Sequence, residues 1–292
     1  MEISYFPGCT LKTNGRNFEG TALPLLELFD IHAKELDDWY CCGVSFSQSA
    51  DNLMQQIAPI RTLVKAKESG NTRLLTLCAM CYNTLQRAIF FIKSDEDKRD
   101  IIHDFMYREG TKFYGDEVEV VHLLTLLKEI GSEEIKKRVK KKVDEFKIAP
   151  YYGCMLLRPK EVAIDSSNAP EIMEEILEAA GCETTYFPFK TECCASYQIV
   201  NNSEIVKART KKIVNSAVKN GADVIVLSCP LCFYNLDEIQ IEIKKEDKNF
   251  KTIPVLYFTQ ILALLMGIKS EVNNFSLHYI DPTPVLKRKG LL

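Results

Sequence analysis

The sequence has little that points to a membrane protein, a nucleic-acid binder or a secreted protein. Its charges nearly cancel, with 37 Lys and Arg against 40 Asp and Glu, so no positive excess favours nucleic acid or an anionic membrane surface. The longest apolar stretch, residues 255–268, is too short to span a bilayer. Residues 1–6 lack the basic region of a signal peptide. We therefore expect a cytoplasmic protein without a membrane span.

Several common cofactor motifs are also missing. No two glycines have the G-x-G spacing of a dinucleotide-binding loop, and no G-x-x-x-x-G pair is followed by the Lys-Ser/Thr of a P-loop. The zinc-protease motif H-E-x-x-H is absent, and the four histidines, His32, His103, His122 and His278, are scattered. The ferredoxin run C-x2-C-x2-C-x3-C does not occur. These absences argue against direct binding of a nicotinamide or a flavin.

The 11 cysteines form the most informative pattern in the chain. An odd number of cysteines without a signal peptide favours metal-binding or redox thiols in a reducing cytosol over structural disulfides. Ten of them fall into two sets with one spacing: a single cysteine, an adjacent pair, then C-x-x-C. The first cysteine set is Cys9, Cys41, Cys42, Cys78 and Cys81, and the second cysteine set is Cys154, Cys193, Cys194, Cys229 and Cys232. Cys182 lies outside both sets, and we interpret it as a small buried apolar side chain.

The residues around the cysteines repeat as well. Residues 3–9 match 148–154, residues 74–85 match 225–236, and residues 122–127 match 257–262. We infer an internal duplication, with a first cysteine-rich domain over residues 1–132, a charged helical linker over 133–147, and a second cysteine-rich domain with a C-terminal tail over 148–292.

Two segments outside the repeats have more than one interpretation. The linker is either a basic docking patch or a solvated helix, with Ser132 as its N-cap and Glu133 and Glu134 in its first turn; the helix is favoured. The tail after residue 268 either docks a partner or wraps around its own domain.

Strand and helix patterns alternate in both halves, which predicts an α/β fold. Residues 2–6 are expected to form a short strand. Residues 74–77 and 224–227 are apolar runs typical of buried strands in parallel sheets, and residues 172–180 have the apolar spacing of a helix. Each C-x-x-C begins where such a strand ends. Ligand sites in open α/β sheets gather at the carboxyl ends of strands, so we expect Cys9, Cys78, Cys154 and Cys229 to lie there.

A set of five cysteines fits an iron–sulfur cluster better than a single metal ion. Thiolates are soft ligands that select zinc, copper(I) or iron–sulfur clusters. A structural zinc ion needs only four ligands, and two adjacent cysteines reach different metal atoms more easily than they reach one ion. Paired zinc sites, a dithiol oxidoreductase that uses C-x-x-C alone, and buried free thiols are the alternatives. We predict an iron–sulfur cluster of unusual shape in each half.

The pattern C-x(31–38)-C-C-x(34–35)-C-x-x-C, present twice, resembles the cysteine-rich CCG motif of the catalytic B subunit of heterodisulfide reductase. The resemblance covers nearly the whole chain, from Tyr5-Phe-Pro-Gly-Cys9 to Gly290-Leu-Leu292, and both cysteine sets are complete. One departure is Ala195, which stands where the motif has glycine. An alanine there argues against a backbone conformation with positive φ.

The resemblance implies two tandem CCG domains with Rossmann-like parallel or mixed sheets and with the clusters at the interface between the domains. It implies that each cysteine set holds one noncubane 4Fe–4S cluster. It also implies that the mixed disulfide of coenzyme M and coenzyme B is cleaved between the clusters, one sulfur going to each, as in methanogenesis. The implied partners are the iron–sulfur C subunit and the flavin A subunit, which performs electron bifurcation, with a hydrogenase or formate dehydrogenase attached in some complexes.

Two other classes of function stay open beside this one. The first is a related CCG redox subunit of a bifurcating or respiratory complex, which acts on another disulfide or passes electrons to an organic acid or a quinone. The second is a binding module in which the cysteines hold structural metal.

Overall fold

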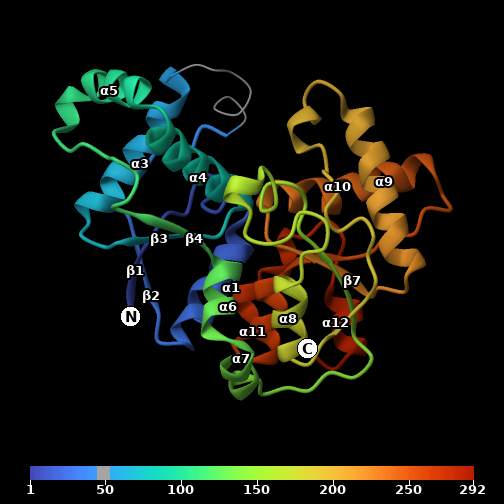
Figure 1. Ribbon diagram of the computed structural model, residues 1–292. Helices are drawn as coiled ribbons and strands as arrows, with labels where there is room; N and C mark the ends of the chain where they lie inside the picture. The colour runs from blue at the N-terminus through green and yellow to red at the C-terminus, as the bar shows by residue number, and fades with distance from the viewer. Residues whose placement is uncertain (45–52) are drawn as a thin grey trace.

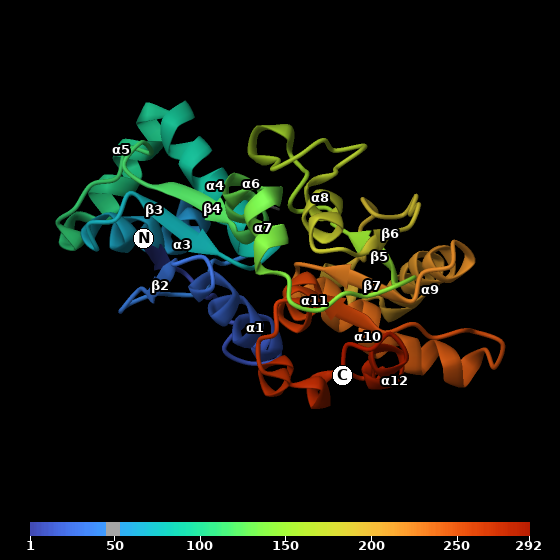
Figure 2. The same ribbon diagram turned by 90° about the horizontal axis from the view of Figure 1, so that it is seen from below.

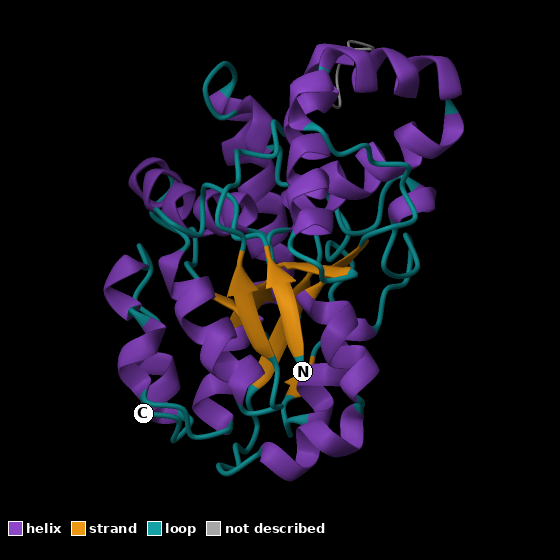
Figure 3. Ribbon diagram, turned by 90° about the vertical axis from the view of Figure 1, so that its left-hand side faces the viewer, coloured by secondary structure: helices purple, strands orange, loops and turns teal. Residues whose placement is uncertain are grey.

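The computed structural model describes residues 1–44 and 53–292, which fold into two similar halves (Figure 1). Each half contains one four-stranded sheet in which all neighbouring strands are parallel, with the orders β2-β1-β3-β4 and β6-β5-β7-β8. Helices flank the strands on both sides (Figure 3). The predicted α/β fold with two duplicated domains is confirmed, and both sheets are parallel rather than mixed.

The two halves repeat one order of strands and helices. The first half contains β1 (Glu2–Tyr5), α1 (Arg16–Glu27), β2 (His32–Glu35), η1 (Leu53–Gln56), α3 (Ile57–Glu68), β3 (Arg73–Thr76), α4 (Ala79–Ser94), α5 (Glu96–Phe105), η2 (Tyr107–Glu109), β4 (Glu119–His122) and α6 (Leu123–Ile130). After α7 (Ser132–Arg138), the second half contains β5 (Lys147–Tyr151), η3 (Lys160–Val162), α8 (Ile172–Ala179), β6 (Glu183–Thr184), η4 (Ser196–Gln198), α9 (Ser203–Lys219), β7 (Val224–Leu227), α10 (Pro230–Glu246), β8 (Val255–Tyr257) and α11 (Phe258–Leu265). The tail adds η5 (Ser270–Asn273), η6 (Phe275–Leu277) and α12 (Thr283–Arg288).

The central strands β3 and β7 are almost entirely buried, because helices cover both faces of each sheet. All four residues of β7 are buried, and the same holds for the last three residues of β3. A strand buried on both faces has no polar alternation, which explains the continuous apolar runs in the sequence. No helix within the described ranges is both long enough and apolar enough to cross a membrane.

The two halves are joined by α1 and α11, which lie side by side in both views (Figures 1 and 2). The ring of Phe18 on α1 stacks on Tyr257, with ring centroids 4.3 Å apart, and meets Phe258 edge to face. Beside this stack, the hydroxyls of Thr21 and Thr259 are 2.7 Å apart and fully buried. An aromatic stack with a satisfied polar pair fixes both the distance and the register of the two helices.

The linker is helical only in its first part. Helix α7 ends at Arg138, and residues 139–146 continue without regular structure toward β5. The prediction that Ser132 caps this helix is wrong, because Gly131, with φ of +91°, is the N-cap and Ser132 is the first helical residue. Lys136 and Lys137 pair with Glu133 and Glu134 one turn earlier, as expected of a solvated helix.

The C-terminal tail packs on its own domain and also reaches the first half. Asn17 on α1 and Gln260 on α11 both direct amide groups at Nε2 of His278, at 3.2 and 3.0 Å. The buried carboxylate of Asp237 on α10 accepts hydrogen bonds from the backbone N–H groups of Tyr279 and Ile280. The tail is therefore part of the contact between the halves.

Burial raises the pKa of Asp237 to about 7, although two backbone donors oppose the shift and the nearby Glu238 adds to it. The folded chain therefore binds a proton that the unfolded chain has lost above its ordinary pKa of 3.8, so stability falls as pH rises from about 4 to about 7. The amide introduced by Asp237→Asn cannot ionise but keeps an oxygen acceptor. Between pH 5 and pH 8, wild type should lose roughly 3 kcal/mol of stability relative to Asp237→Asn, measured by denaturant unfolding of both proteins. A parallel pH dependence of the two proteins would contradict this assignment.

Candidate metal centre

Both cysteine sets lie at the carboxyl ends of strands, as predicted for the first member and the C-x-x-C of each. Cys9 follows β1, the pair Cys41 and Cys42 follows β2, and Cys78 comes two residues after β3. The second set follows β5, β6 and β7 in the same manner. Because the strands are parallel, three loops converge at one edge of each sheet and bring their thiols together.

The sulfur atoms contact one another in the same pairs in both halves. In the second set, Sγ of Cys154 is 3.7 Å from Sγ of Cys193, and Sγ of Cys194 is 3.4 Å from Sγ of Cys232. In the first set, Sγ of Cys41 is 3.8 Å from Sγ of Cys9, and the thiols of Cys42 and Cys81 share a hydrogen bond. Each member of an adjacent pair therefore has its own partner elsewhere in its set, and in the first set Cys41 and Cys42 also share a hydrogen bond.

These contacts favour the thiolate at defined positions. The pKa of Cys193 falls to about 6, chiefly because Cys193 accepts a hydrogen bond from Cys154, whose own pKa rises. Hydrogen bonds from Cys41 and Cys81 lower the pKa of Cys42 to about 3. Since the thiolate is the form that binds metal, each set contains at least one thiol ready to act as a ligand.

A glycine precedes the first cysteine of each set, Cys9 or Cys154, which we call the leading cysteine. This glycine makes room for the last cysteine of the same set. Gly8 has φ of +70°, and a Cβ atom at this position would lie 2.7 Å from Sγ of Cys81. Gly153 has φ of +68°, and its Cβ would lie 3.3 Å from Sγ of Cys232. Only glycine combines this backbone conformation with so close an approach of a sulfur atom.

The residue after the adjacent cysteine pair has positive φ in both halves, at +74° for Gly43 and +60° for Ala195. The expectation that alanine excludes this conformation at position 195 is wrong. The left-handed conformation costs a non-glycine residue about 1–2 kcal/mol. It also directs the N–H of Ala195 at Sγ of Cys193, 3.3 Å away, and this bond helps to lower the pKa of Cys193.

Each half contacts the loop that follows the leading cysteine of the other half. The side-chain amide of Asn83 on α4 donates to the carbonyl oxygens of Met155 and Arg158, both at 2.7 Å, in the loop that follows Cys154. In the opposite direction, the backbone at Gly15, after Cys9, packs on Pro230 at the start of α10. The C-x-x-C helix of one half thus lies against the leading loop of the other half, which brings the two cysteine sets to a common interface.

Polar atoms beside the cysteines are left without partners in the described chain. They are the hydroxyls of Thr76 at the end of β3, Ser228 next to Cys229, and Tyr257 at the end of β8. An unpaired buried hydroxyl costs about 1–3 kcal/mol, so each of these hydroxyls near a cysteine fits a position that receives a further group. A donor set made only of thiols fits a soft metal ion or an iron–sulfur group.

Other candidate ligands from the sequence are already engaged. Nε2 of His122 donates to the carbonyl of Leu77 at 3.0 Å, and its Nδ1 accepts from the N–H of Leu124. Cys182 lies before β6, at the opposite end of the sheet from the second set, and burial raises its pKa to about 12. Among residues 1–44 and 53–292, no three His, Cys, Asp or Glu side chains are arranged as ligands of one metal ion.

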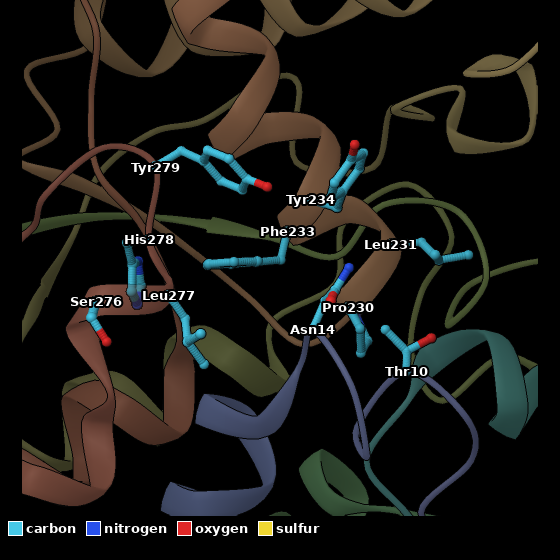
Figure 4. Close-up of a pocket in the computed structure, with 10 residues that line it drawn as sticks. All are labelled: Thr10, Asn14, Pro230, Leu231, Phe233, Tyr234, Ser276, Leu277, His278 and Tyr279. Carbon is cyan, nitrogen blue, oxygen red and sulfur yellow. The ribbon is translucent and has the colours of Figure 1, made fainter.

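A cavity of about 330 Å³ opens between the two halves (Figure 4). Thr10 and Asn14 line it from the first half, and Phe233, Tyr234 and Tyr279 line it from the second. It adjoins both cysteine sets, because Thr10 follows Cys9, and Pro230 and Leu231, between Cys229 and Cys232, also line it. The resemblance implied a cavity between the halves, but sequence reasoning did not predict which residues line it, since its walls come from segments that only the tertiary fold brings together.

The chain is similar to cysteine-rich redox proteins. A family profile described as "Cysteine-rich domain" (CCG) matches residues 3–86 and 148–237, once in each half. The 8-methylmenaquinol:fumarate reductase membrane anchor subunit of Wolinella succinogenes is 32% identical over 97% of this chain and 98% of its own length. The B subunit of the ferredoxin/F420H2-dependent CoB-CoM heterodisulfide reductase of Methanosarcina acetivorans is 27% identical over 92% and 91%. The resemblance inferred from the cysteine spacing is thus confirmed.

A solved structure supports the fold. The crystal structure of a hypothetical protein from Helicobacter pylori matches 95% of this chain with a TM-score of 0.75 at 15% identity. The chain spans 51% of that protein, so the similarity describes the shared fold alone.

The contact between Gly8 and Cys81 predicts a specific defect in Gly8→Ala. The added methyl group must displace Sγ of Cys81, so the variant should lose metal from the first cysteine set and keep it in the second. Gly70→Ala is the matched control, because Gly70 has φ of +82° with nothing within 4 Å of the added Cβ. Backbone strain alone should lower the free energy of unfolding of that control by about 1–2 kcal/mol, and the control should retain its metal. Metal analysis and thermal unfolding check both variants, and equal metal loss in both would contradict the steric explanation.

Proposed function

Because this chain belongs to the CCG cysteine-rich domain family, we propose that it is a redox subunit of a multi-subunit oxidoreductase and that each cysteine set holds one iron–sulfur cluster. The observation that carries the proposal is the presence of two equivalent sets of five thiols. Each set lies at the carboxyl edge of its own sheet, and contacts of the loop after the leading cysteine with the other half bring the two sets to one interface. The cytoplasm is the proposed location.

The sulfur contacts support a noncubane 4Fe–4S cluster on each set. Cys193 contacts Cys154, whereas its neighbour Cys194 contacts Cys232, so the adjacent thiols approach different points. A single tetrahedral ion needs its ligands to converge, while a cluster of several irons accepts ligands at separate metal atoms. When bound, such clusters supply one-electron transfer. The ligands would be Cys9, Cys41, Cys42, Cys78 and Cys81 in the first half and Cys154, Cys193, Cys194, Cys229 and Cys232 in the second.

The substrate we propose first is a small-molecule disulfide, with the CoB-CoM heterodisulfide as the reference compound. Reduction of one disulfide takes two electrons and two protons and yields two thiols. Two one-electron sites that the chain presents at a common interface match this stoichiometry. The electrons would arrive from partner subunits, the iron–sulfur C subunit and the flavin A subunit in the heterodisulfide reductase arrangement, with a hydrogenase or formate dehydrogenase as their source.

A second candidate is electron transfer between a quinol and an organic acid. The relative from Wolinella succinogenes, 32% identical, is named as a subunit of a methylmenaquinol:fumarate reductase. The cavity between the halves also has an aromatic wall, formed by Phe233, Tyr234 and Tyr279. Flat apolar ring systems pack well on aromatic side chains.

The cluster assignment predicts about eight irons per chain after anaerobic preparation with intact cluster assembly, about four for each set. Cys193→Ser should remove the second-set iron and leave the first set loaded, and Cys41→Ser should do the reverse. Cys182→Ser is the control and should keep both clusters, because Cys182 lies at the far end of its sheet. Iron and sulfide analysis with electron paramagnetic resonance separates these outcomes. About two zinc ions per chain without visible charge-transfer absorption would contradict the proposal.

The two substrate candidates make opposite predictions for the loaded protein with its partner subunits. If the disulfide is the substrate, reduced viologen should drive consumption of the CoB-CoM heterodisulfide and release two thiols for every two electrons. A menaquinol analogue should then neither reduce the clusters nor inhibit the reaction. Rapid cluster reduction by the quinol, with the disulfide inert, would establish the second candidate and exclude the first.

A further inference from the structure

Tyr257 occupies a central place between the two cysteine sets. It ends β8 and is the N-cap of α11, so its side chain leaves the sheet at the same edge as the thiols of the second set. The ring is fully buried between Phe18 of the first half and Phe233 of the second, at centroid distances of 4.3 and 4.6 Å. Aromatic faces on both sides restrict the ring and thereby fix the position of its hydroxyl.

Cysteines of both sets lie near this hydroxyl. The pKa of Tyr257 is raised well above its ordinary value, first by burial and then by Cys229 and Cys78, with Asp237 and Cys232 contributing less. Cys78 belongs to the first set, whereas Cys229 and Cys232 belong to the second. The geometry agrees with this. Tyr257 pairs in register with Leu227, two residues before Cys229, and its ring stacks on Phe233, which directly follows Cys232, while Phe18 of the first half lies against its other face.

The described chain offers the Tyr257 hydroxyl no hydrogen-bond partner. A buried O–H group is normally paired, and each exception calls for a physical reason. His122, at the equivalent position of the first half, is also fully buried, but both of its ring nitrogens are bonded to backbone groups. Of these two equivalent positions, only the one in the second half therefore keeps an unpaired donor.

We propose that the Tyr257 hydroxyl donates a hydrogen bond to an anionic sulfur atom in the gap between the two cysteine sets. This inference rests on the proposed function, which supplies two sources of such an acceptor, a cluster sulfur or the sulfur of a substrate thiolate. A hydrogen bond to a cluster sulfur stabilises the reduced, more negative state and raises the reduction potential. A hydrogen bond to a substrate sulfur stabilises the developing thiolate instead.

Tyr257→Phe tests the proposal, because phenylalanine keeps the aromatic stack and removes only the hydroxyl. If a cluster sulfur accepts the bond, a redox titration without substrate should show one cluster signal at a more negative midpoint potential. A tenfold change in the one-electron equilibrium would correspond to a shift of about 59 mV. If the substrate sulfur accepts it, the potentials should stay unchanged, and kcat for the disulfide should fall about tenfold or more.

Tyr152→Phe is the matched control. Tyr152 is also fully buried and stands two residues before Cys154, but its hydroxyl donates to Glu174 and accepts from the N–H of Met173. Its removal should lower thermal stability without moving a potential or the electron paramagnetic resonance spectrum. Unchanged potentials and unchanged kcat in iron-replete Tyr257→Phe would overturn the inference. Failure of the proposed function would differ visibly, because the wild-type chain itself would then carry no iron and give no cluster signal.

Discussion

The meeting of three loops at the carboxyl edge of a parallel sheet is the constraint on which the rest of this molecule depends. In a parallel sheet neighbouring strands all end at the same edge, so cysteines far apart in sequence come within sulfur contact without any special chain path. The first set spans residues 9–81, and its sulfurs nevertheless lie about as close to one another as those of the second set. Burial of the central strands β3 and β7 fixes the part of that edge from which the C-x-x-C segments start.

Close packing of sulfur then decides which backbone residues are permitted nearby. Gly8 approaches the last thiol of its set so closely that a side chain there has no room, and a Cβ at Gly153 would make a tight contact with Sγ of Cys232. At position 195 the space exists, and only the conformational cost opposes alanine. The N–H of Ala195 bonds the Cys193 sulfur in this conformation, which offsets part of that cost. Glycine is therefore favoured for two separate reasons in this fold, a close steric contact and a left-handed backbone conformation. Only the steric contact strictly requires glycine.

The sequence alone predicts what depends on local pattern, and it fails where distant segments meet. The strand over residues 224–227 is visible because a run of four consecutive apolar residues is typical of a buried strand. The edge position of the thiols follows from the parallel order. Nothing in the sequence near Asn83 indicates that its amide bonds the loop after Cys154, and nothing near Tyr257 indicates that its ring lies between Phe18 and Phe233. These contacts depend on how the halves pack, which leaves no periodic signal in either segment.

The duplication kept the cysteines of the two sets equivalent while their surroundings diverged. Among the described residues, Cys9 and Cys41 are exposed, whereas their counterparts Cys154 and Cys193 are half-buried. Both ring nitrogens of His122 form hydrogen bonds with backbone groups, whereas the hydroxyl of Tyr257 has no hydrogen-bond partner among the described residues. Tail residues of the second half also line the cavity beside α10. Reduction potential depends on solvent exposure and on hydrogen bonds to sulfur as well as on the ligands. Two chemically identical thiol sets in such unequal surroundings would hold their clusters at unequal potentials, and a difference in potential gives the passage of electrons between them a direction.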